Sequence, residues 1–163
     1  MLLTSRDGSQ LEVHIVGYQF PDSDENWLLI HTSVTTAVGY GESLDPCWET
    51  QEARRIITWF RAMSQSVPVH PWGGYCLEHE LEFELIGESE SSVTLRADII
   101  LEHGVWQPSN GSQPIRDHGF SLALELERRQ LAVAADELEE ELSHYPPREP
   151  EQVIPSPLRA VEA

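Results

Sequence analysis

Between residues 77 and 85, glutamates alternate strictly with apolar or histidine side chains. A period of two residues is typical of a β-strand with one buried face. The next apolar alternation follows a polar turn at residues 87–92. The inward positions are predicted to be Leu77, His79, Leu81, Phe83 and Leu85 on one strand and Val93, Leu95, Ala97, Ile99 and Leu101 on the other. These two segments therefore predict an antiparallel hairpin.

Three further segments have the composition of strands. Residues 11–20 alternate in the same way, and residues 27–38 are rich in threonine, valine and isoleucine up to two glycines. An acidic loop joins them, so they predict a second hairpin. A last strand is predicted from Phe120 to Leu126, after a loop rich in proline, glycine and asparagine at residues 107–119.

Two segments have helical periodicity. The first has Thr50 as its expected N-cap and is predicted to end near Gln65, and the second is predicted from about Arg128 to His144. Each carries one apolar stripe that can pack against a sheet. We expect an α+β fold, with an antiparallel sheet of about five or six strands and two helices packed on one face.

The end of the chain differs in composition from the rest. Residues 149–163 contain three prolines among charged residues and few apolar side chains to bury. We therefore expect a single α+β domain at residues 1–148 and a disordered, proline-rich tail at residues 149–163.

The charge balance restricts the choice of partner. The 163 residues include 28 acidic and 10 basic side chains, which gives a formal net charge of −18. Such a surface repels nucleic acid and anionic membranes, and it attracts basic proteins. With no leader-like segment and no apolar run of about 20 residues, the sequence indicates a cytoplasmic protein. Alternatively, the acidity serves solubility alone.

Two groups of carboxylates are candidates for partner binding. The alternation before residue 86 places four glutamates in a line on the outward face of the strand, and more carboxylates crowd the polar side of the second helix. The candidate residues are Glu78, Glu80, Glu82, Glu84, Asp136, Glu137 and Glu140. The row on the strand is either a solvated sheet face or a recognition surface for a basic partner.

Catalytic and metal-binding patterns are weak. The sequence has neither a phosphate-binding loop, nor a dinucleotide fingerprint, nor a nucleophile elbow. Cys76 and His79 would point to opposite faces of a strand, and no second pair of ligands completes a zinc set. We expect no catalytic residue, no metal and no cofactor. Whether Cys47 and Cys76 form a disulfide stays open.

Several short strings suggest a family. They are Gly17-Tyr18-Gln19-Phe20-Pro21, Trp27-Leu28, Trp59-Phe60, Leu81-Glu82-Phe83-Glu84, Val105-Trp106 and Tyr145-Pro146-Pro147-Arg148. In this order, over about residues 11–148, the chain resembles the family related to the inhibitor of wall-associated protein A. It departs from the family pattern at Glu78-His79, where a Glu-Pro pair is usual, and at Glu127, where a Ser or Asp cap is usual.

The members of that family are regarded as bacterial toxin-immunity proteins. The resemblance therefore implies a non-enzymatic protein that occludes a toxin domain, and the acidic charge predicts that this domain is basic, as in a nuclease. Two other hypotheses stay open: a general acidic protein-interaction module, and a small metal-dependent enzyme using Cys76, His79 or His103.

Overall fold

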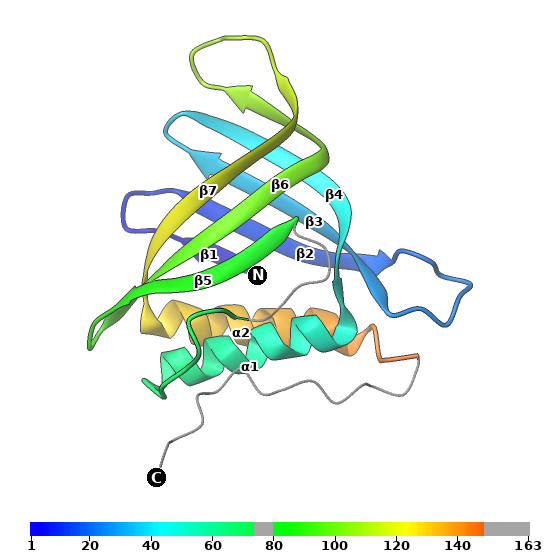
Figure 1. The fold of residues 1–163 in the computed structure, drawn as a ribbon, viewed down its shortest axis with the longest axis vertical. Helices are drawn as coiled ribbons and strands as arrows, with labels where there is room; N and C mark the ends of the chain where they lie inside the picture. Colours follow the sequence, from blue (N-terminus) through cyan, green and yellow to red (C-terminus); the bar gives the residue numbers. More distant parts are fainter. Residues whose placement is uncertain (74–79, 149–163) are drawn as a thin grey trace.

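The computed structural model describes residues 1–73 and 80–148, which form one antiparallel sheet and two helices (Figure 1). The seven strands are β1 (Leu2–Thr4), β2 (Gln10–Tyr18), β3 (Trp27–Thr36), β4 (Gly39–Glu49), β5 (Leu81–Glu88), β6 (Ser92–Pro108) and β7 (Ile115–Glu127). The helices are α1 (Thr50–Ser64) and α2 (Arg128–Ser143). The expected α+β class is confirmed. The predicted tail at residues 149–163 lies outside the described residues.

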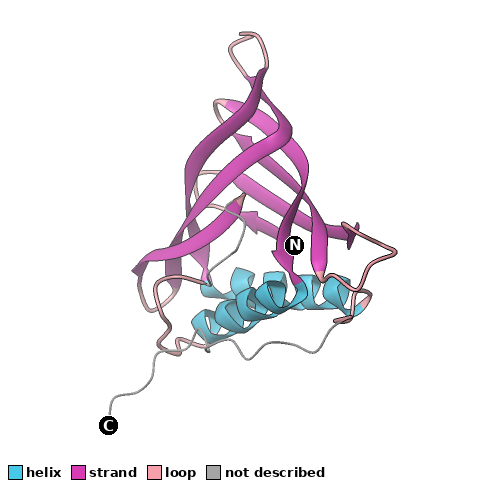
Figure 2. Cartoon of the chain, turned by 45° about the vertical axis from the view of Figure 1, so that its right-hand side comes forward, coloured by secondary structure: helices cyan, strands magenta, loops and turns pink. Residues whose placement is uncertain are grey.

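The sheet is organised around β6, its longest strand. The strand order is β1-β2-β3-β4-β6-β5, and β7 pairs with the other edge of β6. The sheet curls into a tapering half-barrel, and both helices lie across its wider end (Figure 2). There the Arg6 N–H donates to the Glu125 carbonyl at 3.0 Å, which brings the β1–β2 turn against β7.

The core fills the space between the inner face of the sheet and the helices. The predicted inward residues of β6, from Val93 to Leu101, are all buried, as are Leu81 and Phe83 of β5. The rings of Phe60 from α1 and Phe83 meet with centroids 5.5 Å apart. Burying side chains of this size contributes about 1.5–3 kcal/mol each.

Strands β1 and β4 were not predicted. Gly39 and Gly41 suggested the end of a strand, whereas both lie in β4 with their Cα atoms facing the core. A Cβ atom on Gly39 would lie 2.6 Å from the Trp106 ring, and one on Gly41 would lie 2.7 Å from Leu101. These glycines let β6 side chains pack directly on the β4 backbone. The predicted loop at 107–119 was also too long, because β6 reaches Pro108 and β7 begins at Ile115.

The helix ends differ from expectation at one position. The N-cap of α1 is Glu49 and not Thr50, because Glu49 forms a reciprocal capping box with Glu52. The predicted end near Gln65 is confirmed. Helix α2 matches the prediction within a residue, and Glu127 caps it through a capping box with Gln130.

Candidate interaction surface

Helix α2 carries the predicted carboxylates on its solvent side. Its buried stripe includes Leu131, Leu138 and Leu142, which hold the helix against the core. This orientation exposes Asp136, Glu137, Glu139 and Glu140 and leaves Glu141 half-buried. All three predicted α2 residues therefore reach the surface, although their surroundings differ.

The Asp136 carboxylate forms an ion pair within the protein. The guanidinium of Arg61, on α1, lies 2.9 Å from the Asp136 carboxylate and 2.5 Å from that of Glu139. The hydrogen bond from Arg61 lowers the pKa of Glu139, and the same two partners, led by Glu139, raise the pKa of Arg61. Asp136 and Glu139 thus link the two helices, and Arg61 balances part of their charge.

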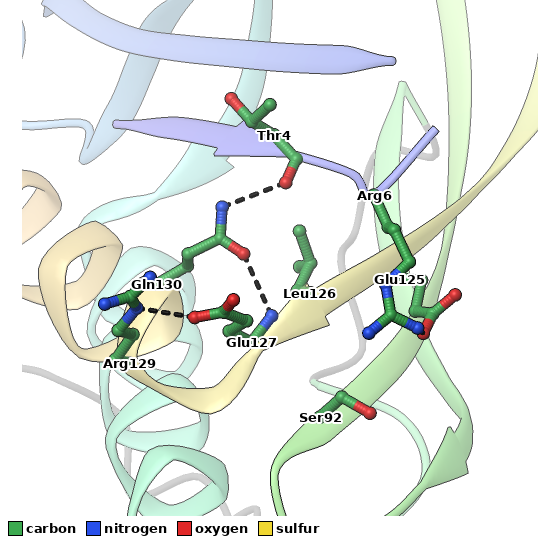
Figure 3. Close-up of a pocket in the computed structure, with 8 residues that line it drawn as sticks. All are labelled: Thr4, Arg6, Ser92, Glu125, Leu126, Glu127, Arg129 and Gln130. Atoms are coloured by element: carbon green, nitrogen blue, oxygen red, sulfur yellow. Dashed lines mark hydrogen bonds and ion pairs between the residues drawn. The ribbon is translucent and has the colours of Figure 1, made fainter. Parts of the chain in front are cut away.

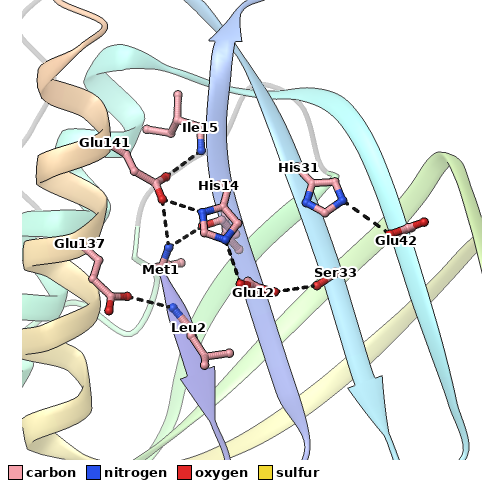
Figure 4. Close-up of polar contacts among 11 residues, drawn as sticks. Met1, Leu2, Glu12, His14, Ile15, His31, Ser33, Glu42, Glu137 and Glu141 are labelled. Atoms are coloured by element: carbon pink, nitrogen blue, oxygen red, sulfur yellow. Dashed lines mark hydrogen bonds and ion pairs between the residues drawn. The ribbon is translucent and has the colours of Figure 1, made fainter.

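The other side of α2 contacts β1 and β2 (Figure 4). The Glu137 carboxylate accepts a hydrogen bond from the Leu2 N–H at 3.2 Å. The Glu141 carboxylate accepts one from the Ile15 N–H at 2.8 Å and lies 2.6 Å from Nδ1 of His14. Glu12 lies 2.9 Å from Nε2 of the same ring. Hydrogen bonding to Glu12 and then to Glu141 raises the pKa of His14.

Polar side chains continue across the outer face of β3 and β4. His31 lies 3.7 Å from Glu42 (Figure 4). The Tyr40 hydroxyl donates to Glu42 at 2.5 Å. The bond to Glu42, with burial second, raises the pKa of Tyr40 to about 12. The outer face of the first strands is therefore a band of carboxylates and their hydrogen-bond partners.

An open depression lies between α2 and the first two strands. Its volume is about 500 Å³, and it is lined by Met1, Leu2, Glu12, His14, Glu137, Glu140, Glu141 and His144. Among the residues that the structure describes, the exposed carboxylate of Glu140 has no hydrogen bond or ion pair. Glu137 and Glu140 thus meet at one concave acidic site, where Glu140 is free to bind a cation from outside.

The glutamates in β5 and just before it have a different environment. Glu80, Glu82 and Glu84 are only partly exposed, and Glu78 lies outside the described residues. Glu84 is opposite Arg96 in the ladder, and their side chains form an ion pair at 2.6 Å. The same guanidinium lies over the Trp72 ring, 5.7 Å from its centroid. Part of this row of glutamates therefore takes part in contacts within the protein.

Residues 71–73, which precede the gap in the described chain, cover the outer edge of β5. The Leu85 N–H donates to the Pro71 carbonyl at 2.6 Å, and the Gly73 N–H donates to the Phe83 carbonyl at 3.1 Å. Residues 71–73 therefore lie along β5 like a short extra strand.

The outward glutamates of β5 and the helix α2 lie on opposite faces of the sheet, because α2 packs on the inner face.

A second cavity, of about 230 Å³, lies where β1, β7 and the start of α2 meet (Figure 3). Arg6 pairs with Glu125 and Arg129 pairs with Glu127, both at 2.5 Å. The Gln130 amide donates to the Thr4 carbonyl at 2.9 Å. Since both arginines already have carboxylate partners, these contacts join the three elements and leave no unpaired cation there.

The structure also locates the candidates for metal or catalytic chemistry. Cys76 and His79 lie outside the described residues, and Cys47 is buried. His103 is exposed and bonds to Asp45. Within residues 1–73 and 80–148, no three His, Cys, Asp or Glu side chains are grouped so that they could hold a metal ion. Neither described helix combines the length and the apolar character needed to span a membrane.

Sequence reasoning missed Glu12, His14 and Glu141 as members of the acidic depression. Glu12 and His14 alternate with buried residues of β2, which marks them only as outward-facing. More than 120 residues separate His14 from Glu141. No local pattern connects them, so only the folded chain reveals the site.

These features define an acidic α+β protein with a concave, carboxylate-lined surface formed by its last helix and first strands. The family model described as the Immunity protein WapI-like family matches residues 1–146, so the chain belongs to that family. The family resemblance noted in the sequence is therefore confirmed. Comparisons with curated proteins and with solved structures gave no match.

Proposed function

We propose that this protein binds a toxin domain in the cytoplasm and neutralises it, without catalysis, by occluding the surface through which the toxin acts. Membership of an immunity-protein family supports a toxin as the partner. A net charge of −18 supports a basic toxin domain, such as an enzyme that acts on nucleic acid.

The observation that carries this proposal is the acidic depression beside α2. It presents Glu137 and Glu140 together, and the Glu140 carboxylate has no partner among the described residues. A cationic side chain of a toxin can enter the depression without displacing an internal ion pair of Glu140. Charge complementarity of this kind mainly increases the association rate. Glu80, Glu82 and Glu84, in β5 and just before it, are proposed together with Glu78 and Asp136 as secondary contributors to the same attraction.

The test uses a candidate toxin domain encoded by the neighbouring gene. Cells that express this domain should survive only when they also produce the protein. In purified form, the double variant Glu137→Gln/Glu140→Gln should associate with the toxin about tenfold more slowly at low salt, and the rate should depend less on ionic strength. Glu90→Gln, in an exposed turn, is the control for removing a carboxylate elsewhere. Equal association rates for the double variant and the control would argue against the depression as the binding site.

The general acidic interaction module is the second candidate. The extended band of carboxylates on the outer face of β2 to β4 favours it, since this band would attract many basic proteins. A protein of that kind would bind the toxin domain without protecting the cell. Survival of the toxin-expressing cells therefore separates the two candidates.

A further inference from the structure

Strand β7 has one edge that is only partly paired. Strand β6 occupies its other edge throughout. On the outer edge, the N–H of Glu125 donates to Ser5 Oγ and its carbonyl accepts from the Arg6 N–H, both at 3.0 Å. The N–H and C=O groups of one strand residue point to the same edge, and this direction alternates along the strand. Gly119, Ser121 and Ala123 therefore point their backbone groups to the same edge as Glu125.

No strand of the described chain pairs with Gly119, Ser121 and Ala123 on that edge. These three residues are exposed, small and uncharged. Folded proteins usually protect an open sheet edge with lysine, proline or an inward-pointing charge. Here charged residues stand only at the two ends of the stretch, at Asp117 and Glu125. The stretch between them can accept another strand.

A hollow of about 440 Å³ lies beside this edge. Trp106, His118 and Phe120 form an aromatic cluster in its wall, with centroids of Trp106 and Phe120 5.0 Å apart. The turns that join β1 to β2 and β3 to β4 also contribute residues to its lining. One of these turns contributes Val38, whose exposed fraction is 68%.

A carboxylate stands at the same hollow. Asp7 lines it, and hydrogen bonds from the backbone and side chain of Ser9 lower the pKa of Asp7, so it stays ionised at neutral pH. The hollow therefore offers aromatic surface for apolar side chains and a negative charge beside it. An extended segment that alternates apolar and basic residues matches both features, because its apolar side chains can point into the hollow while its long basic side chains bend round the rim to the exposed Asp7.

We propose that the edge of β7 at residues 119–123 is a docking site for an extended, basic segment of another protein, which adds to the sheet as a strand. Its apolar side chains enter the hollow beside Trp106 and Phe120, and a basic side chain approaches Asp7. A second copy of this chain is disfavoured, because two molecules with a net charge of −18 repel each other. The site is separate from the depression beside α2 and does not depend on the proposed function.

The test uses a short, fluorescently labelled peptide in which lysine and valine alternate. It should bind saturably in a polarisation assay, and methylation of its backbone nitrogens on one edge should weaken binding about tenfold. A peptide that alternates glutamate and valine should bind more weakly still. Binding of the methylated peptide at full strength, or no binding of the unmodified one, would overturn the proposal.

A variant of the protein locates the site. Ala123→Pro removes an N–H that points away from β6, and edge strands tolerate proline in such positions. This variant should fold normally and bind the peptide about tenfold more weakly, whereas Ala123→Ser should bind as the natural chain does. Amide signals of Gly119, Ser121 and Ala123 should shift when the peptide is added. If sedimentation instead shows a dimer that Ala123→Pro dissociates, the occupant is a second copy and the assignment to a basic partner is wrong.

Discussion

The Nδ1 atom of His103 lies 2.6 Å from a carboxylate oxygen of Asp45, which is completely buried although 71% of the His103 side chain is exposed. The irregularity in β6 between Leu101 and Val105 carries this histidine. The other carboxylate oxygen of Asp45 has no hydrogen-bond partner among the described residues. The imidazole on the surface is therefore the main partner of a carboxylate in the interior.

We expect His103→Ala to lower the melting temperature, because the Asp45 carboxylate would stay buried without its partner. Adding Asp45→Asn should recover part of the loss, since a neutral amide costs less to bury than a lone charge. His144→Ala, at another exposed histidine, is the control. A double variant no more stable than His103→Ala alone would show that the pair is not coupled.

Two glycines should respond in opposite ways to the same substitution. A Cβ atom on Gly104 would lie 2.2 Å from the Glu42 carbonyl oxygen and 2.8 Å from Cβ of Ser43, whereas one on Gly17 would meet nothing within 4 Å. Gly104→Ala should therefore lower the free energy of unfolding by about 2–3 kcal/mol. Gly17→Ala should leave it unchanged or raise it by up to about 1 kcal/mol. Denaturant unfolding measures both, and similar values for the two variants would contradict the close packing of β6 on β4.

The ion pair between Glu84 and Arg96 predicts the effect of removing charge from β5. A fully solvated row would be unaffected or slightly stabilised by replacing Glu80, Glu82 and Glu84 with Gln. Since the Glu84 side chain is only 19% exposed and paired, we expect the triple variant to lose about 1 kcal/mol of stability. Glu102→Gln, at an exposed position on β6, is the comparison. A triple variant as stable as Glu102→Gln would indicate that the row is a solvated face.

The surroundings of His14 predict a pH dependence. Because Glu12 and Glu141 raise its folded-state pKa above the usual value of 6.5, protonated His14 stabilises the fold. This contribution is complete below 6.5 and is lost as the pH rises through the raised pKa. The stability difference between the natural chain and His14→Asn should therefore be larger near pH 6 than near pH 8.5, by roughly a few tenths of a kcal/mol at this partly exposed site. Imidazole chemical shifts should give a pKa above 6.5, and Glu12→Gln should lower it.

The alternation of residues predicted the strands that form most of the core. The inward positions from Val93 to Leu101 followed directly from their period of two, because each of these strands buries a single face. Strand β4 was not predicted because Gly39 and Gly41 resemble a turn. Only the position of the Trp106 ring explains them as parts of a strand. The cap of α1 was displaced by one residue because Glu49 and Glu52 satisfy each other.

The candidate surface was predictable only in part. The stripe of leucines fixes which side of α2 faces water, so the exposure of Asp136, Glu137 and Glu140 followed from helical periodicity. Which of these carboxylates form an ion pair within the protein could not be predicted from periodicity, because this depends on the position of Arg61 on the other helix. Likewise, the pairing of Glu84 depends on the strand register that sets Arg96 opposite it.

The bond from Arg6 to Glu125 joins residues 119 positions apart, and Glu141 reaches back to Ile15 over 126 positions. Contacts of such sequence separation slow folding, because a long loop must be closed before they form. During synthesis, the first strands would leave the ribosome long before β7 and α2 exist to hold them. The described domain therefore completes its fold only after α2 has been made, and until then its first hairpin is exposed to other chains.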